Sequence, residues 1–166
     1  FALDSVSFSQ RYWQEIETAF EKVDIYEGPD VFVRDAAKYP DWKIDLLAVH
    51  WTMSEIVNGG LAQYFENATA VLAPEAVRGF QNIGRPDLST ALQKAMLLLG
   101  EVYPREQQLR TERLTALTGK APTEGQSFSL IPKWVAKKVG MNQSTSPFSE
   151  FDDLFTSASD AVEEAM

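Results

Sequence analysis

The chain of 166 residues contains no cysteine. Disulfides, zinc–thiolate sites, iron–sulfur clusters and cysteine nucleophiles are therefore excluded. The sequence also lacks any apolar run close to the roughly 18 residues that a membrane span requires, and it shows no secretory signal pattern. We therefore expect a cytoplasmic protein that does not associate with a membrane.

Histidine is nearly absent as well, since His50 is the only one. It lies among apolar residues, and neither an HExxH nor an ExxH pattern surrounds it. The chain has no GxSxG nucleophile elbow and no glycine-rich phosphate loop. These absences predict a protein without a metal or cofactor that is not an enzyme. One alternative stays open, namely a pocket near His50 and Asn58 that binds a small molecule or catalyses a reaction.

Basic residues are scarce at both ends of the chain. Residues 1–30 hold seven acids and two bases, and residues 150–166 hold six acids and no base. The segment between them is slightly basic, and the net charge of the whole chain is −9. Proteins that bind nucleic acid normally carry the opposite charge. We therefore expect no direct contact with DNA or RNA.

The acids of the two ends are the candidate partner-binding residues. In the first predicted helix, acids recur about one turn apart and would form a stripe. Together with acids near the end of the chain, the candidates are Glu17, Glu21, Asp24, Asp152, Asp153, Asp160 and Glu163. The alternative is a structural interaction module in which solvated acids only keep the protein soluble.

Apolar residues recur at helical spacing along most of the chain, and few segments alternate with a period of two. The pattern predicts an all-α fold, a compact multi-helix single domain over residues 1–166 with short connections. Residues 31–38 are only weakly patterned. The predicted helices cover Ser9–Val23, Asp41–Val57, Leu61–Phe65, Pro74–Ile83, Asp87–Leu99, Pro104–Leu117, a short Pro132–Val139 and a last acidic stretch.

The stretch WTMSEIVNGGLAQYFEN, residues 51–67, is the most distinctive in the chain. An apolar helical pattern runs into Asn58-Gly59-Gly60 and resumes at once with aromatic and amide residues. The glycines predict a left-handed helix end and an abrupt corner. The polar side chains there either line a pocket or satisfy peptide groups that the corner frees. We favour the second interpretation, which predicts a large loss of stability for Asn58→Ala.

This stretch resembles a bacterial family of dimeric DNA-mimic proteins, the nineteenth in its naming series and also catalogued as a domain of unknown function. The matching residues are Trp51, Glu55, Val57, Asn58, Gly59, Gly60, Gln63, Tyr64, Phe65 and Asn67. Further similarity lies in GFQNIGRPDLSTALQKAMLLLG, in YPREQQLRTERL, where Arg110 or Arg113 is the usual basic position, and in FSEFDDLF. The resemblance covers most of residues 42–155.

The resemblance implies an all-α homodimer that acts through its surface and not by catalysis. An acidic face would imitate DNA phosphates and occupy the DNA-binding surface of a basic protein such as a transcription factor. Duplex DNA carries one charge per roughly 1.7 Å of its axis. We therefore expect several acidic stripes, or two subunits, to contribute to such a face.

Overall fold

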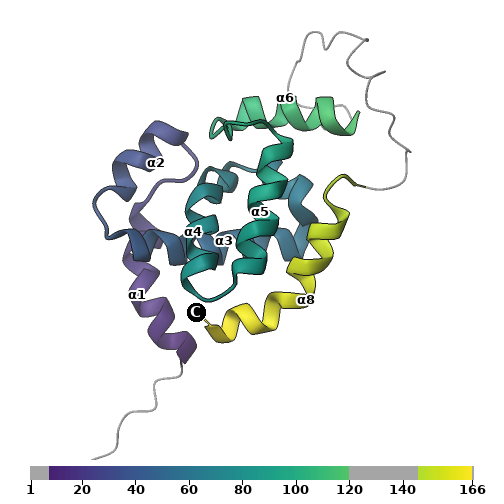
Figure 1. Ribbon diagram of the computed structural model, residues 1–166. Coiled ribbons are helices and arrows are strands. Elements are labelled where there is room, and N and C mark those ends of the chain that lie inside the picture. Colours follow the sequence, from purple (N-terminus) through teal and green to yellow (C-terminus); the bar gives the residue numbers. More distant parts are fainter. Residues whose placement is uncertain (1–7, 120–145, 166) are drawn as a thin grey trace, which may run out of the picture.

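Helices form the framework of the protein (Figure 1). The computed structural model describes the backbone of residues 8–119 and 146–165, and the side chains within 14–119 and 146–159. This part of the chain contains no strand, so the predicted all-α fold is confirmed. The elements are α1 (Phe8–Lys22), α2 (Pro29–Ala36), α3 (Asp41–Glu66), the 3-10 helix η1 (Ala68–Leu72), α4 (Ala73–Asn82), α5 (Pro86–Leu98), α6 (Gln107–Thr118) and α8 (Ser149–Ala165).

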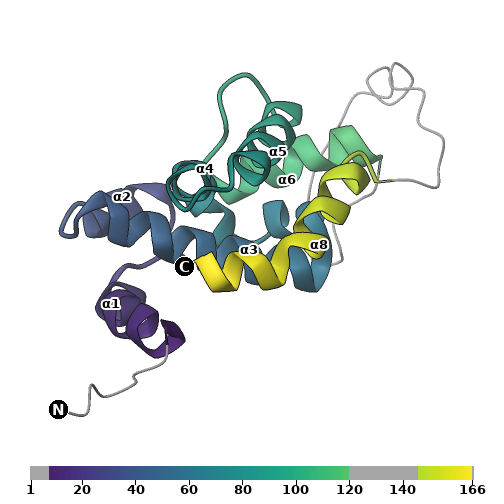
Figure 2. The ribbon, with the colours of Figure 1, turned by 60° about the horizontal axis from the view of Figure 1, so that its bottom comes forward.

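Helix α3 is the centre of the fold. Helices α1, α4, α6 and α8 and the 3-10 helix η1 all pack against it. Figure 2 shows α4, α5 and α6 on one side of α3 and α1 on the other. Buried side chains occur around much of the circumference of α3, among them Ile44, Leu47, Val49 and Ile56. A helix that is apolar on most faces must be covered on most faces, which explains this central position.

The predicted corner lies inside α3. Gly60 has φ 77° and ψ 171°, and the helical hydrogen-bonding pattern resumes directly after it. That backbone conformation is essentially restricted to glycine, because a Cβ atom would be strained there. The second part of α3 continues to Glu66. The sequence prediction of a break followed by a short helix is thus confirmed.

Two elements differ from the sequence prediction. The weakly patterned residues 31–38 belong largely to α2, which begins with Pro29 and buries Phe32. Helix η1 was not predicted at all, because its five residues are too few to show a period. The predicted short helix Pro132–Val139 lies outside the described residues.

The start of α3 differs slightly from what the sequence favours. Aspartate is a common N-cap residue, which makes Asp41 the expected cap, but Pro40 occupies the capping position and Asp41 is the first helical residue. An acid in the first turn still interacts favourably with the positive end of the helix dipole.

None of the described helices combines the length and the apolar character that crossing a membrane requires.

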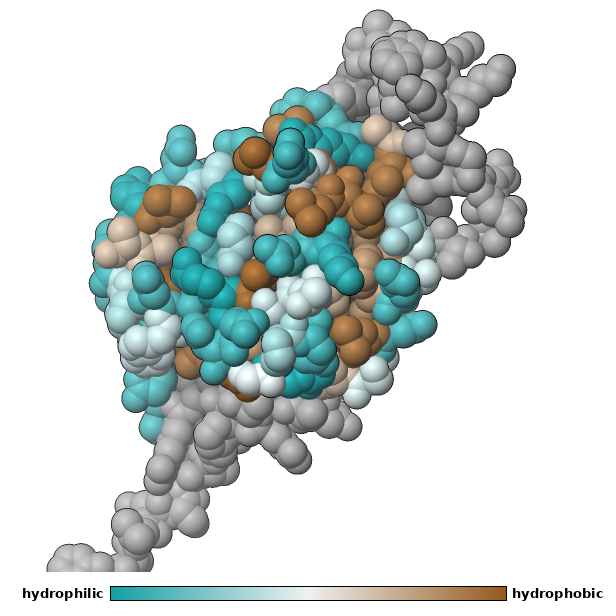
Figure 3. Space-filling view, viewed as in Figure 1, coloured by the Kyte–Doolittle hydropathy of each residue, from teal (hydrophilic) through white to brown (hydrophobic). Residues whose placement is uncertain are grey.

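Several large apolar side chains are exposed on the described surface, and some of them gather near the C-terminal end of α5. Leu97, Leu98 and Val102 are exposed there. Figure 3 shows apolar atoms gathered in the same region, where Figure 1 draws the upper end of α5 beside α6. Apolar groups of this kind are often places of contact with other molecules.

Candidate functional site

Helix α1 presents two of the predicted acids to solvent. Ile16, Ala19 and Val23 form its buried face. Glu17 and Glu21 lie one turn apart, and both are exposed. Neither forms an ion pair within the described part of the chain. Their charges are therefore available to a partner.

Asp24, the third predicted acid of this end, has a different role. Its Oδ1 atom accepts hydrogen bonds from the backbone N–H groups of Tyr26, at 2.8 Å, and Glu27, at 3.0 Å. Such a turn, closed by an aspartate side chain, reverses the chain after a helix. The backbone N–H of Asp24 in turn donates to Oδ2 of the buried Asp35 at 3.4 Å. Asp24 thus fixes the connection between α1 and α2.

The predicted acids of α8 also divide into two kinds. Asp153 is exposed, whereas the neighbouring Asp152 is half-buried. The Asp152 Oδ1 atom accepts a hydrogen bond from the backbone N–H of Leu61 at 2.7 Å. Burial raises the pKa of the Asp152 carboxyl, and the Leu61 N–H opposes that rise. Asp160 and Glu163 lie on the α8 backbone, but their side chains are outside the described residues.

The two acidic ends of the chain lie on the same side of the molecule. Figures 1 and 2 both draw the C-terminal end of α8 near α1. Both helices also pack against α3, which holds them in a fixed relation. The end of α8 that carries Asp160 and Glu163 is therefore near α1, whereas Asp153 belongs to the first turns of α8, at its other end.

Side chains of residues 51–67 form hydrogen bonds between the part of α3 before Gly60 and the segment after it. The hydroxyl groups of Tyr64 and Thr52 are hydrogen-bonded at 2.8 Å, and both side chains are fully buried. The Asn67 amide donates to Oε2 of Glu55 at 2.8 Å. Each bond joins the helix before Gly60 to the segment after it. Two of the polar motif residues, Tyr64 and Asn67, therefore stabilise the fold.

Asn58 and Gln63 do not take part in this network. Both side chains are exposed, and neither makes a hydrogen bond to the described residues. The expectation that their amides satisfy the peptide groups of the corner was wrong. A carboxylate from α8, that of Asp152, accepts the Leu61 N–H instead. Sequence reasoning missed this contact because 91 residues separate its partners.

Asn58→Ala is therefore expected to change the free energy of unfolding by less than about 0.5 kcal/mol, as exposed substitutions usually do. Gly60→Ala is the matched comparison and should cost about 1–3 kcal/mol, because alanine is strained at that φ and ψ. Urea denaturation of both variants measures the difference. A loss above about 2 kcal/mol for Asn58→Ala would contradict the described geometry.

The residues of the alternative pocket are not among those that line the groove found in the described part of the chain. His50 is half-buried, with its ring centroid 6.2 Å from that of Phe20 and 6.2 Å from that of Trp51. The described part of the chain has an open groove of about 620 Å³ elsewhere, which includes Tyr26, Gly28, Arg105 and Gln107 among its lining residues and neither His50, Asn58 nor Gln63. Within the same described residues, no group of three or more His, Asp or Glu side chains could hold a metal ion.

The two arginines of α6 both bind backbone carbonyl groups. Arg110 is completely buried and donates to the carbonyls of Phe65 and Asn67 at the end of α3. Arg113 donates to the Leu99 carbonyl, at the end of α5, at 2.6 Å. Cations at the C-terminal ends of helices satisfy free carbonyls and oppose the helix dipole. The basic position of the motif YPREQQLRTERL therefore has a structural role.

Comparison with known proteins gives a match to one family model. A family model described as DMP19-like protein, that is, like DNA mimic protein 19, matches residues 37–166. No curated protein and no solved structure matches the chain. The matched segment includes the corner of α3 and all of α8 but excludes α1. Because the match extends over well more than half of its length, the chain belongs to the DMP19-like protein family.

Proposed function

We propose that the protein is a non-enzymatic DNA mimic that binds the DNA-binding surface of a basic protein, such as a transcription factor. The observation that carries the proposal is the exposure of Glu17 and Glu21 on α1 and of Asp153 on α8, together with the approach of the C-terminal end of α8 to α1. Membership of the DNA-mimic family supports the same function. Asp160 and Glu163 complete the proposed contact set.

Charge density explains why more than one helix is needed. Glu17 and Glu21 are four residues apart, which is an axial rise of about 6 Å in a helix. Duplex DNA carries one charge per roughly 1.7 Å of its axis. One stripe therefore supplies only a fraction of the charge density of DNA. The proposal accordingly includes acids from α8 and a second subunit in a homodimer of cytoplasmic, single-domain chains.

Binding measurements on a charge-neutralised variant test the proposal. The variant Glu17→Gln/Glu21→Gln/Asp153→Asn removes the exposed acids of both helices. The control Glu66→Gln/Glu101→Gln/Glu106→Gln changes the net charge equally at exposed positions elsewhere. A DNA-binding protein captured from a lysate of the encoding organism should bind the first variant about 10-fold more weakly at low salt and bind the control like the wild type.

The same experiment separates mimicry from other kinds of binding. Duplex DNA should compete with the acidic protein for the DNA-binding surface of the captured protein, and high salt should dissociate the complex, because exposed charges are screened. If the two triple variants bind equally well, the acids of α1 and α8 serve solubility only. If duplex DNA does not compete, the partner is bound outside its DNA-binding surface.

A further inference from the structure

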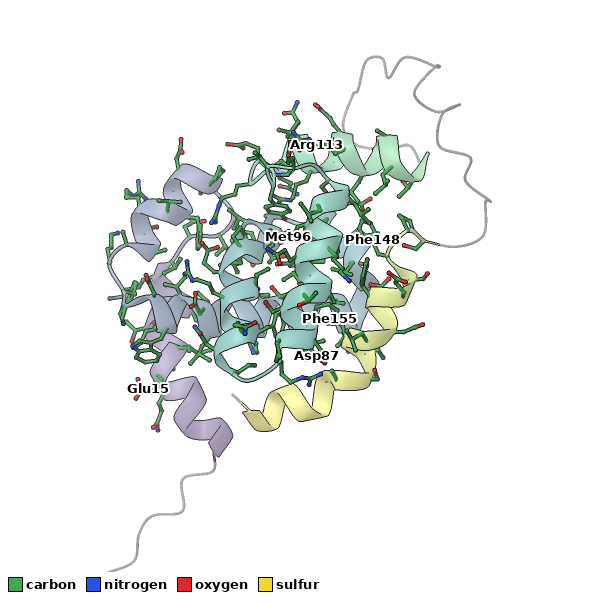
Figure 4. The ribbon with its side chains drawn as sticks, viewed as in Figure 1. Glu15, Asp87, Met96, Arg113, Phe148 and Phe155 are labelled. Atoms are coloured by element: carbon green, nitrogen blue, oxygen red, sulfur yellow. The ribbon has the colours of Figure 1, made fainter. Side chains whose placement is uncertain are left out.

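One face of α8 anchors the helix to the rest of the protein at three residues. Phe148 directly precedes α8, and its carbonyl accepts the Asp152 N–H. Phe148, Asp152 and Phe155 are four and three residues apart and therefore lie on the same side of the helix. The two phenylalanines are fully buried. The Phe148 ring contacts Phe65 in α3 at 5.5 Å between centroids, and the Phe155 ring contacts Phe80 in α4 at 5.6 Å. Figure 4 shows both rings on the inner side of α8.

Asp152 occupies the middle of this face, directly above the corner of α3. Backbone N–H groups at the start of a helical segment lack partners within the helix. Leu61 begins the segment after Gly60, and its N–H donates to the Asp152 carboxylate at 2.7 Å. A Cβ atom at Gly60 would lie only 3.2 Å from Oδ2 of Asp152. The glycine therefore allows both the turn of the backbone and the close approach of α8.

We propose that Asp152 is a positioning residue and that the corner around Gly60 is the docking site of α8. The aromatic contacts fix how deeply α8 packs, and the carboxylate fixes its register on α3. This register determines where exposed acids such as Asp153 point. The docking itself does not depend on the proposed function, whereas its consequence for partner binding rests on it.

The chemistry of the contact distinguishes positioning from direct partner binding. A carboxylate that contacts a basic partner acts through its charge, which an amide cannot replace. A carboxylate that accepts one N–H bond can be replaced by asparagine, because the amide oxygen is also an acceptor. The raised pKa agrees with the second role, since burial makes the charged form costly at this place.

Three variants test the proposal. Asp152→Ala removes the acceptor and the charge, and Asp152→Asn removes the charge alone. Asp153→Asn is the matched control, because it removes an equal charge from the exposed neighbouring residue. Amide hydrogen exchange of Leu61, measured by NMR, reports the docking of α8 without any partner. Fluorescence anisotropy with a labelled deca-lysine peptide at low salt reports binding by the acidic surface.

We expect the Leu61 amide to exchange on the order of 10-fold faster in Asp152→Ala and at the wild-type rate in the other two variants. Deca-lysine should bind Asp152→Asn like the wild type and should bind Asp152→Ala and Asp153→Asn more weakly. If Asp152→Asn exchanges as fast as Asp152→Ala, or fails to fold, the positioning role is overturned. If Asp152→Asn keeps its slow exchange but loses peptide binding, Asp152 is a direct contact.

Binding of deca-lysine to the wild type distinguishes a failure of the proposed function from a failure of the docking role of Asp152. If the wild type does not bind the peptide at low salt, the proposed acidic binding surface fails. The exchange rates of Leu61 still decide whether Asp152 docks α8. If Asp152→Ala does not fold, the Leu61 exchange rates of Asp152→Asn and Asp153→Asn are compared instead. Equal rates agree with the docking role of Asp152, and faster exchange in Asp152→Asn overturns it.

Discussion

Replacing Arg110 with methionine is expected to destabilise the protein by roughly 4 kcal/mol or more, a loss in the range of the largest single-residue effects. The Arg110 side chain has no exposed surface. Its guanidinium donates to four backbone carbonyls, those of Phe65, Asn67, Pro104 and Arg105. Methionine has a similar length but no donor. The substitution therefore removes the hydrogen bonds and leaves the packing volume nearly unchanged.

The size of the effect follows from what remains after the substitution. Each buried carbonyl without a donor costs about 1–3 kcal/mol, because it has also lost its contact with water. The loss stays below four times this cost, because the bonds to Asn67 and Arg105 are only partly buried and the Asn67 carbonyl also accepts the Ala70 N–H at 3.3 Å. The carbonyls of Phe65 and Asn67 lie at the C-terminal end of α3, where the helix dipole favours a cation. Burial lowers the pKa of the Arg110 guanidinium.

Thermal and urea unfolding measure this loss, and Arg85→Met is the matched control. Arg85 forms an ion pair with Asp87 at the surface, at 2.7 Å. Exposed pairs of this kind contribute about 0–1 kcal/mol, so the control should remain close to the wild type. An Arg110→Met variant within about 1 kcal/mol of the wild type would contradict the described hydrogen bonds.

The elements that the sequence predicted well are those whose signal is local. Helix α3 shows its burial in its own apolar pattern, and Asn58-Gly59-Gly60 interrupts that pattern at the observed corner. Helix α2 has only eight residues, and η1 has five. Such segments are too short for a period to be recognised, and η1 in addition packs against both α3 and α4.

The candidate site was harder to predict, because a count of charges does not show which way a side chain faces. Asp152 and Asp153 are adjacent and have the same charge, yet one binds the backbone of α3 and the other faces solvent. A signal for this difference exists in the sequence. Asp152 lies on the same helical face as Phe148 and Phe155, and an acid on an apolar face needs a hydrogen-bond donor.

The second large effect is expected for Gly79→Ala in α4, which should destabilise the protein by roughly 2–4 kcal/mol. In an ordinary helix the same substitution stabilises by about 1 kcal/mol, since alanine favours helix more than glycine does. Here a Cβ atom would lie 2.6 Å from the backbone oxygen of Asp45 and 2.5 Å from the side chain of Val49. Both residues belong to α3, and a backbone oxygen inside a helix cannot rotate away.

The added methyl group must therefore push α4 away from α3, and this shift gives the prediction a second readout. Arg78, next to Gly79, donates to the buried Asp45 carboxylate through Nε and Nη2, at 3.2 and 2.7 Å. Gln81→Ala is the control, since Gln81 is exposed on the same helix and should change stability by less than about 0.5 kcal/mol. Displacement of α4 weakens the Arg78–Asp45 bonds, so Arg78→Ala should cost less in the Gly79→Ala background than in the wild type. A stabilised Gly79→Ala variant would instead show that helix propensity outweighs the contact, and the two helices would then have to lie farther apart than described.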